Sequence, residues 1–116
     1  MDDARGAKAC YYAVLMRVGI GYDSHPFAAG RKLILGGIEI QNAKGLAGHS
    51  DADAVAHAVT DAILGAAGLG DIGRMFPNDD PQWKDASSID LLNKAFLKVV
   101  EAGFQFVHAD ASCHLR

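Results

Sequence analysis

The chain has 116 residues, half of them apolar, and 11 Lys and Arg residues against 14 Asp and Glu residues give a formal charge of −3. A chain of this length forms a single domain with a modest core. The charge balance leaves no basic surface for a phosphate backbone and argues against a nucleic-acid partner, and no apolar run is long enough to span a bilayer. The widely separated Cys10 and Cys113 predict no disulfide framework, which favours a reducing compartment.

The first 15 residues differ in character from the rest of the chain. They start with an acidic pair, Asp2 and Asp3, and contain no Ser or Thr, which is unlike a transit peptide. We interpret residues 1–15 as an N-terminal extension of unknown role and residues 16–116 as the domain proper.

Two strands are predicted first, over residues 11–22 and 32–40, because both segments are rich in Val, Ile, Leu and Tyr and are bounded by Gly and Pro. A helix follows, with Ser50 or Asp51 as its N-cap and apolar residues at helical spacing as far as Ile63. It ends in the small-residue segment 65–68.

A loop is predicted over residues 70–86, where Asp, Gly and Pro are frequent. The second helix spans residues 88–102, with Ser87 as its N-cap, Gly103 as its C-terminal stop and an apolar stripe at positions 89, 92, 96 and 99. A third strand is expected over residues 104–112. This order predicts an α+β fold in which a mixed sheet packs on two helices as a ferredoxin-like layer.

The first candidate ligands are Asp23 and His25. In an extended segment, side chains two positions apart point to the same side, so this carboxylate and this imidazole could converge on one ion. Pro26 disfavours helical backbone angles at His25. The alternative is a polar strand end that binds nothing.

A second candidate group lies on the first predicted helix, where Asp53, His57 and Asp61 are spaced four apart in one polar row. A histidine with a carboxylate one turn away on each side suits a metal ligand that neighbouring acceptors orient. The alternative is a solvated helix face with charge pairs. Taken together, Asp23, His25 and His57 supply a donor set common in catalytic zinc sites that keep one position open.

Three further features were considered for binding. His49 and Ser50 precede a predicted helix N-terminus, where backbone N–H groups attract phosphate, although ordinary capping would explain them too. Residues 68–73 match the letters of a dinucleotide-binding glycine motif, but a helix precedes them and a loop comes after, so we reject that interpretation. Acidic and amide side chains of the loop, at Asp71 and at residues 78–80, could bind polyol hydroxyls or simply form turns.

Several short motifs, in this order and spacing, resemble the 2-C-methyl-D-erythritol 2,4-cyclodiphosphate synthase family. The resemblance covers residue 16 to about residue 111 and rests on Gly21-Tyr22-Asp23-Ser24-His25, Leu35-Gly36-Gly37, Gly48-His49-Ser50-Asp51-Ala52-Asp53, His57-Ala58-Val59-Thr60-Asp61-Ala62, and Gly70-Asp71-Ile72-Gly73 with Phe76-Pro77.

The resemblance implies a homotrimeric lyase of the non-mevalonate isoprenoid pathway. Such an enzyme converts 4-diphosphocytidyl-2-C-methyl-D-erythritol 2-phosphate to the cyclic diphosphate and releases CMP. It implies zinc on Asp23, His25 and His57, magnesium with the substrate diphosphate, and His49 as a catalytic stabiliser of developing charge. The implied substrate-binding residues are Asp23, Ser24, His25, His49, Ser50, Asp71, Ile72, Gly73, Phe76, Pro77, Asn78, Asp79 and Asp80.

The resemblance also implies a C-terminal truncation, because family chains continue past residue 116 into the cytidine pocket and the protein ligand of magnesium. An inactive relative that binds zinc or assembles with full-length chains is therefore an alternative, and a generic metal-dependent phosphohydrolase is another. The family's substrate is a small molecule, and we expect neither a nucleic-acid nor a membrane partner. We expect a bacterial cytoplasmic location, with a plastid stroma as the alternative.

Overall fold

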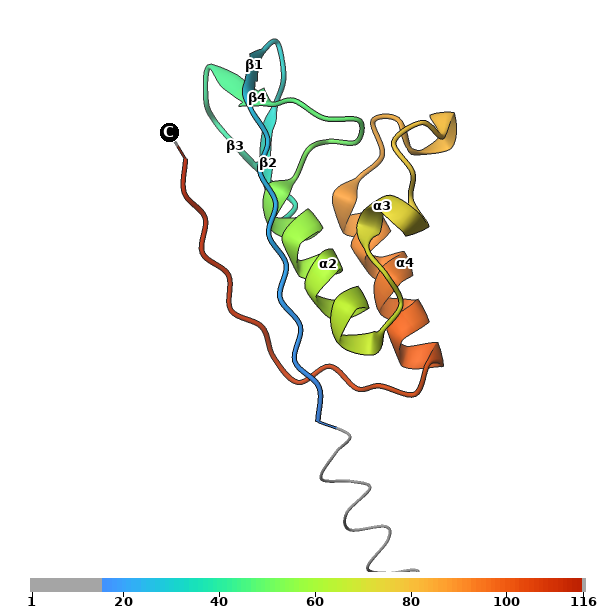
Figure 1. Cartoon of the computed structure of the whole chain (residues 1–116). Coiled ribbons are helices and arrows are strands. Elements are labelled where there is room, and N and C mark those ends of the chain that lie inside the picture. Colours follow the sequence, from blue (N-terminus) through green and yellow to red (C-terminus); the bar gives the residue numbers. More distant parts are fainter. Residues whose placement is uncertain (1–15, 116) are drawn as a thin grey trace, which may run out of the picture.

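A computed structural model of the chain describes residues 16–115, and Figure 1 shows how the elements are arranged. Four short strands come first, followed by two long helices with two short helical turns between them. In chain order they are β1 (Phe27–Ala29), β2 (Leu33–Leu35), β3 (Ile38–Ile40), β4 (Lys44–Leu46), α2 (Ala54–Ala67), α3 (Ile72–Met75), the 3₁₀ helix η1 (Pro81–Trp83) and α4 (Ser88–Glu101). The predicted α+β class is confirmed.

The strands of the described residues form two antiparallel pairs rather than the mixed sheet that we expected. β1 pairs with β4, with Phe27 opposite Leu46, and β2 pairs with β3 inside the β1–β4 connection. The single strand predicted over residues 32–40 is therefore wrong. Gly36 and Gly37 have φ angles of 61° and 79°, and such a pair of left-handed residues turns the chain back into a tight hairpin.

The other two predicted strands are not formed in the described residues. Residues 11–15 lie outside them, while residues 16–22 and 104–112 have no strand assignment and run alongside the helical part (Figure 1). Both segments have strand-like composition, but a strand also needs a neighbour for its backbone groups, and no described segment pairs with them. Propensity alone was therefore misleading here.

Residues 16–22 lie against α2 through their glycines. A Cβ atom on Gly19 would lie 2.0 Å from the Ala62 carbonyl oxygen, and one on Gly21 would lie 1.7 Å from that of Ala58. The alternate side chains are exposed instead, and we call them the apolar row: Met16, Val18, Ile20 and Tyr22. Glycine at every second position thus lets the extended backbone touch the helix, and this contact carries the chain toward Asp23.

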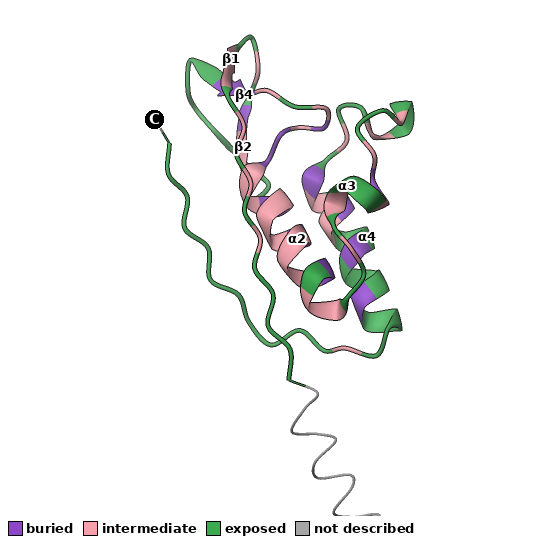
Figure 2. Ribbon diagram, in the orientation of Figure 1, coloured by how far each residue is buried: buried purple, intermediate pink, exposed green. Residues whose placement is uncertain are grey.

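The two long helices pack together through the buried side chains of Leu64, Ala95 and Val99. Figure 2 shows buried stretches of α4 in purple. Ser87 caps α4 as predicted, because its side chain accepts from the backbone N–H of Asp90. The buried face of α4 includes Leu91 and Ala95, so the predicted stripe was partly wrong: Phe96 is 38% exposed. The prediction rested on apolar residues at helical spacing, whereas close contact between the helices favours the small Ala95.

The start of α2 differs from the prediction. The helix begins at Ala54, after Asp53, whose carboxylate accepts from the backbone N–H of Ala56. Either Ser50 or Asp51 was predicted as the cap, but both lie in the preceding loop. Gly68, with a φ of 71°, ends the helix in the small-residue segment as expected.

The predicted loop over residues 70–86 contains short helical structure. Asp71 caps α3 and Asp80 caps η1, each through its side chain. The buried Phe76 meets Trp83 edge to face, with ring centroids 4.9 Å apart. This aromatic contact fixes the course of the loop beside the helices.

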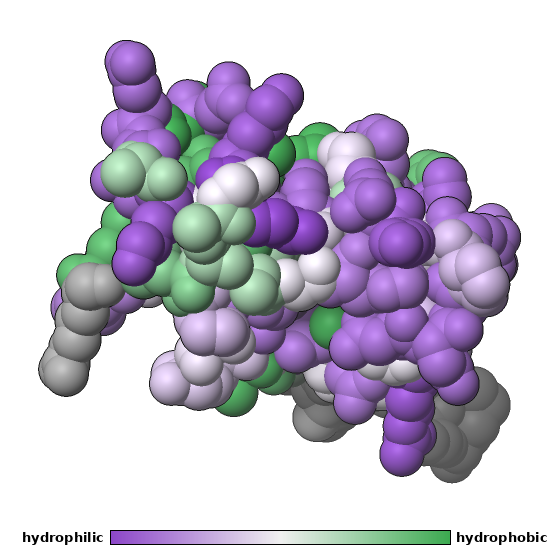
Figure 3. All heavy atoms as spheres, turned by 90° about the horizontal axis from the view of Figure 1, so that it is seen from above, coloured by the Kyte–Doolittle hydropathy of each residue, from purple (hydrophilic) through white to green (hydrophobic). Residues whose placement is uncertain are grey.

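No helix in residues 16–115 combines the length and the apolar character needed to cross a membrane. Viewed from above, hydrophilic side chains cover most of that end of the molecule, with smaller hydrophobic areas among them (Figure 3).

Gly21→Ala should destabilise the fold, because its new Cβ would overlap the Ala58 carbonyl of α2. Overpacking of this kind costs about 1–3 kcal/mol, measured as a lower urea midpoint. The matched control is Gly65→Ala inside α2, where nothing lies within 4 Å of an added Cβ. It should raise stability by about 0.5–1 kcal/mol. Equal midpoints for the two variants would contradict the contact between residues 16–22 and α2.

Candidate functional site

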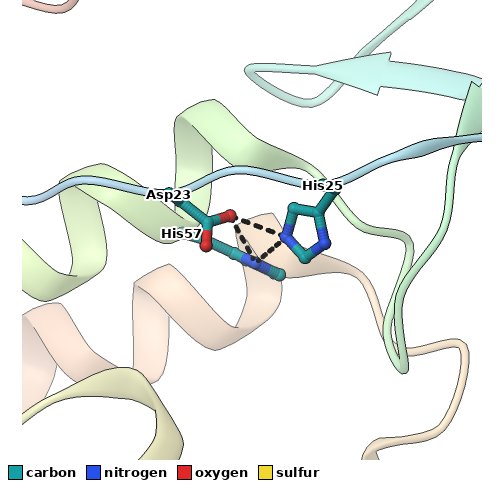
Figure 4. Close-up of side chains that lie close together, drawn as sticks. All are labelled: Asp23, His25 and His57. Atoms are coloured by element: carbon teal, nitrogen blue, oxygen red, sulfur yellow. Dashed lines mark hydrogen bonds and ion pairs between the residues drawn. The ribbon is translucent and has the colours of Figure 1, made fainter.

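The three residues predicted as metal ligands converge in the structure. Asp23 and His25 lie in the extended segment before β1, and His57 lies in the first half of α2 (Figure 4). The Asp23 Oδ2 atom is 2.6 Å from His25 Nε2 and 3.3 Å from His57 Nδ1, and the two ring nitrogens are 3.2 Å apart. In the described part of the chain this is the one group of His, Cys, Asp or Glu side chains with such geometry.

Each imidazole uses its other nitrogen to bind the protein. His25 Nδ1 is 2.9 Å from the Ala47 carbonyl oxygen, which can only accept, so this nitrogen carries the ring's proton. His57 Nε2 is 2.7 Å from the Ser88 hydroxyl and 3.0 Å from that of Ser50. These contacts turn His25 Nε2 and His57 Nδ1 toward the Asp23 carboxylate.

The Asp23 Oδ2 atom provides a test of whether a metal ion fits. This oxygen is buried and accepts no hydrogen bond, although both ring nitrogens are near. Three lone pairs that face one another repel, and a buried carboxylate oxygen without a donor is costly. A divalent cation between them would remove both penalties. At metal–ligand distances of about 2.0–2.1 Å, tetrahedral ligands lie about 3.3 Å apart, close to two of the three separations here.

The loop before α2 is held close to this group by Arg31. Its guanidinium donates to the Leu46 carbonyl at 3.0 Å and to the Ser50 carbonyl at 2.9 Å. Gly48 allows the His25 ring to approach, because a Cβ there would lie 3.2 Å from His25 Nδ1 and 2.9 Å from the Ala52 Cβ. The buried Ala52 has a φ of 58°, an unfavourable value for a residue with a side chain, at the point where the loop turns into α2.

Two residues behind His57 were not predicted to act at this site. Ser88 is fully buried at the start of α4, and its hydroxyl and backbone N–H both bind the Asp51 carboxylate. Asp51 lies 37 positions earlier in the chain, so no local spacing could reveal the contact. The only hint in the sequence was the pair of serines at the start of the second predicted helix. Capping explains Ser87 but gives no role to Ser88.

The carboxylates predicted to flank His57 have other partners. Asp53 is fully buried and accepts from the backbone N–H groups of Gly36 and Gly37 as well as from α2. Asp61 accepts from the N–H of Ile72 at the start of α3. The prediction that they orient the His57 ring is therefore wrong: sharing a helix face places them near one another, but each finds a better donor in a neighbouring loop.

The N-terminus of α2 is likewise occupied by the Asp53 carboxylate, which takes the position that a bound anion would need. His49 lies close by, with Nε2 3.0 Å from the Asp80 carbonyl oxygen, and the Ser50 side chain is turned toward His57. The helix terminus thus gives no support to phosphate binding at these two residues, and their predicted role rests on the resemblance alone.

The remaining predicted substrate residues fall in two places. Ser24 is exposed between the two ligands Asp23 and His25. The others occupy the α3–η1 region, where Phe76 is buried and Asn78 and Asp79 are exposed. The contact between His49 and the Asp80 carbonyl joins this region to the loop beside the metal group.

Comparison with known proteins finds relatives in the family that the sequence motifs resemble. The 2-C-methyl-D-erythritol 2,4-cyclodiphosphate synthase of Bordetella avium (strain 197N) is 58% identical over 98 residues, which are 84% of this chain and 60% of that protein. The bifunctional enzyme IspD/IspF of Anaeromyxobacter dehalogenans (strain 2CP-C) is 52% identical over 111 residues, 96% of this chain and 28% of that protein.

Solved structures also match. The bifunctional IspDF from Campylobacter jejuni aligns with a TM-score of 0.72 and 50% identity over 77% of this chain and 24% of its own. A 2C-methyl-D-erythritol-2,4-cyclodiphosphate synthase in a CDP-bound form aligns with a TM-score of 0.66 and 49% identity over 74% of this chain and 57% of its own.

The chain spans about three fifths of the length of the monofunctional relatives such as that of Bordetella avium, of which it covers 60%. The family model that matches residues 16–116 is that of the YgbB family. Since this match includes the converging Asp23, His25 and His57, the chain belongs to the YgbB family.

Proposed function

We propose that the protein takes part in the cyclisation of 4-diphosphocytidyl-2-C-methyl-D-erythritol 2-phosphate to 2-C-methyl-D-erythritol 2,4-cyclodiphosphate, with release of CMP. The observation that carries this proposal is the metal-ligand group of Asp23, His25 and His57 in a chain of this family. Relatives named for this synthase activity match at 55–58% identity, which favours the reaction over a generic phosphohydrolase.

The reaction is an internal phosphoryl transfer. An oxygen of the substrate's 2-phosphate forms a bond to the phosphorus next to the erythritol unit, and the bond from that phosphorus to the CMP oxygen breaks. Because the substrate supplies its own nucleophile, the protein has to position the two phosphates and offset their charge more than it has to remove a proton.

Zinc fits the donor set best, since one carboxylate and two imidazoles with an open fourth position are common in catalytic zinc sites. Bound there, it would supply a positive charge beside the reacting phosphoryl oxygens. Magnesium would accompany the substrate diphosphate, as its preference for phosphate oxygens suggests.

The chain's own residues have distinct roles in this proposal. His49 would stabilise charge that develops on a phosphate, with Ser50 and Ser24 as neighbouring contacts. The segment from Asp71 to Asp80 would bind the methylerythritol hydroxyls. The hydrogen bond between His49 and the Asp80 carbonyl brings the two regions into contact, which a substrate that spans both would require.

We further propose that the protein is a homotrimer of the bacterial cytoplasm. The apolar row supports assembly: Met16, Val18, Ile20 and Tyr22 are each at least 84% exposed on the side of the segment that faces away from α2. A continuous apolar surface of this kind is typical of an interface. The bacterial relatives and the low cysteine content support the location.

His57→Ala should abolish tight zinc binding, because it removes one of three protein ligands and leaves Asp23 and His25 too few for a stable site. The measurement is zinc content after gel filtration, with one zinc per chain expected for the unchanged protein. The matched control is His108→Ala, which removes an exposed histidine outside the group and should retain the metal. A His57→Ala variant that kept one zinc per chain would show that the ligand assignment is wrong.

The proposed reaction predicts CMP release from the diphosphocytidyl substrate by the folded, zinc-loaded chain, followed by phosphorus NMR detection of the cyclic diphosphate. Inorganic phosphate should not appear from simple phosphate monoesters, since these lack an internal nucleophile. Release of phosphate from such esters without CMP formation would instead favour a phosphohydrolase. A folded, zinc-loaded chain that released neither product would favour the inactive relative.

Val18→Asp should break the trimer, because a charge placed in the centre of the apolar row cannot be buried without cost. Sedimentation equilibrium gives the mass, with three chains expected for the unchanged protein and one for the variant. The control is Leu97→Asp, which alters a side chain 60% exposed on α4, away from the apolar row. An unchanged protein that sediments as a single chain would refute the proposed assembly.

A further inference from the structure

A chain of three side chains leads from the surface loop to the metal-ligand group. The Asp51 carboxylate binds Ser88, whose hydroxyl is 2.7 Å from His57 Nε2. The opposite ring nitrogen, His57 Nδ1, is the atom that faces Asp23 and His25. Asp51 in the loop before α2 and Ser88 in α4 therefore form one hydrogen-bonded chain that ends on the His57 ring.

The direction of each hydrogen bond follows from the acceptors. The Asp51 Oδ1 atom can only accept, so the Ser88 hydroxyl donates to it. With its hydrogen used there, the Ser88 oxygen is left to accept, and the His57 Nε2–H is the donor that reaches it. The ring is then protonated on Nε2, and the Nδ1 lone pair is available on the side of Asp23 and His25.

We propose that Ser88, held by Asp51, is a positioning residue that fixes His57 in the Nε2-protonated tautomer and directs Nδ1 to the metal. The proposal rests on the metal site of the proposed function, but it assigns a role that the ligands themselves do not reveal. Acceptors behind a ligating histidine set its tautomer and orientation, and their loss costs about 10- to 100-fold in metal affinity.

Ser88 is better placed than Ser50 to orient the His57 ring. It is fully buried, and the Asp51 carboxylate fixes both its backbone N–H and its hydroxyl. The Ser50 hydroxyl is farther from the same nitrogen, at 3.0 Å, and its own contacts are longer: 3.3 Å to the Ser88 hydroxyl and 3.4 Å to the Ala52 N–H. Ser50 thus lacks a carboxylate that would orient its hydrogen.

The test uses Ser88→Ala in the full chain. Asp51 keeps its bonds from the backbone N–H groups of Ser88 and Asp53, so the loop retains partners in this variant. We expect zinc affinity, measured by competition with a chromophoric chelator, to fall about 10- to 100-fold. In the metal-free chain at a pH where the ring is neutral, the nitrogen NMR shifts of His57 should change from one tautomer to a mixture.

Ser87→Ala is the matched control, because it removes the adjacent serine and the cap of α4 without touching His57. It should lower stability but leave both the His57 tautomer and the zinc affinity unchanged, which separates positioning from general weakening of the helix. Ser50→Ala should have a smaller effect on both readouts than Ser88→Ala.

The outcomes distinguish this inference from the proposed function. Failure of the unchanged chain to bind zinc would overturn the metal site and this inference with it. Normal zinc binding that Ser88→Ala leaves intact would overturn the positioning role alone, as would a larger loss in Ser50→Ala. If Ser88→Ala does not fold, Asp51→Ala decides, because it removes the oxygen that accepts from the Ser88 hydroxyl. A tautomer mixture and weaker zinc binding would support the role, and wild-type values would overturn it.

Discussion

The fold is organised around one electrostatic problem: a buried carboxylate oxygen and two imidazole lone pairs point at one another. Asp23 Oδ2 accepts no hydrogen bond, while His25 and His57 each use their other ring nitrogen to bind the protein. A divalent cation bound by all three atoms would give each of them a partner. Such an ion would also raise the free energy of unfolding, because a ligand that binds only the folded state stabilises it.

The three ligands are held in place by several contacts rather than by one sheet. The extended segment with Asp23 and His25 is not part of a sheet; it lies on α2 through Gly19 and Gly21. His57 is placed by α2, which packs on α4, and α4 returns Ser88 to the back of the His57 ring. Helix packing and the glycine contact thus bring two distant sequence regions together, and Arg31 and Asp51 fasten the intervening loop.

Much of the helical structure and the ligand set could be predicted from local residue chemistry. Residue type and spacing predicted the Ser87 cap, the end of the first helix within residues 65–68, the second helix and the ligand set. The errors came where long-range partners decide the outcome. Gly36 and Gly37 split a predicted strand because Asp53 holds their N–H groups, and the strand-like segments at 16–22 and 104–112 have no pairing partner among the described residues. Asp51 and Ser88, 37 positions apart, could not be paired from sequence.

The most direct measurement is a crystal structure of the zinc-loaded chain with diffraction recorded on both sides of the zinc absorption edge. We expect one anomalous peak between Asp23 Oδ2, His25 Nε2 and His57 Nδ1, at about 2.0–2.2 Å from each atom. A peak at any other group, such as the exposed Cys113, would contradict this assignment. So would a fully loaded crystal in which these three side chains met without an ion between them.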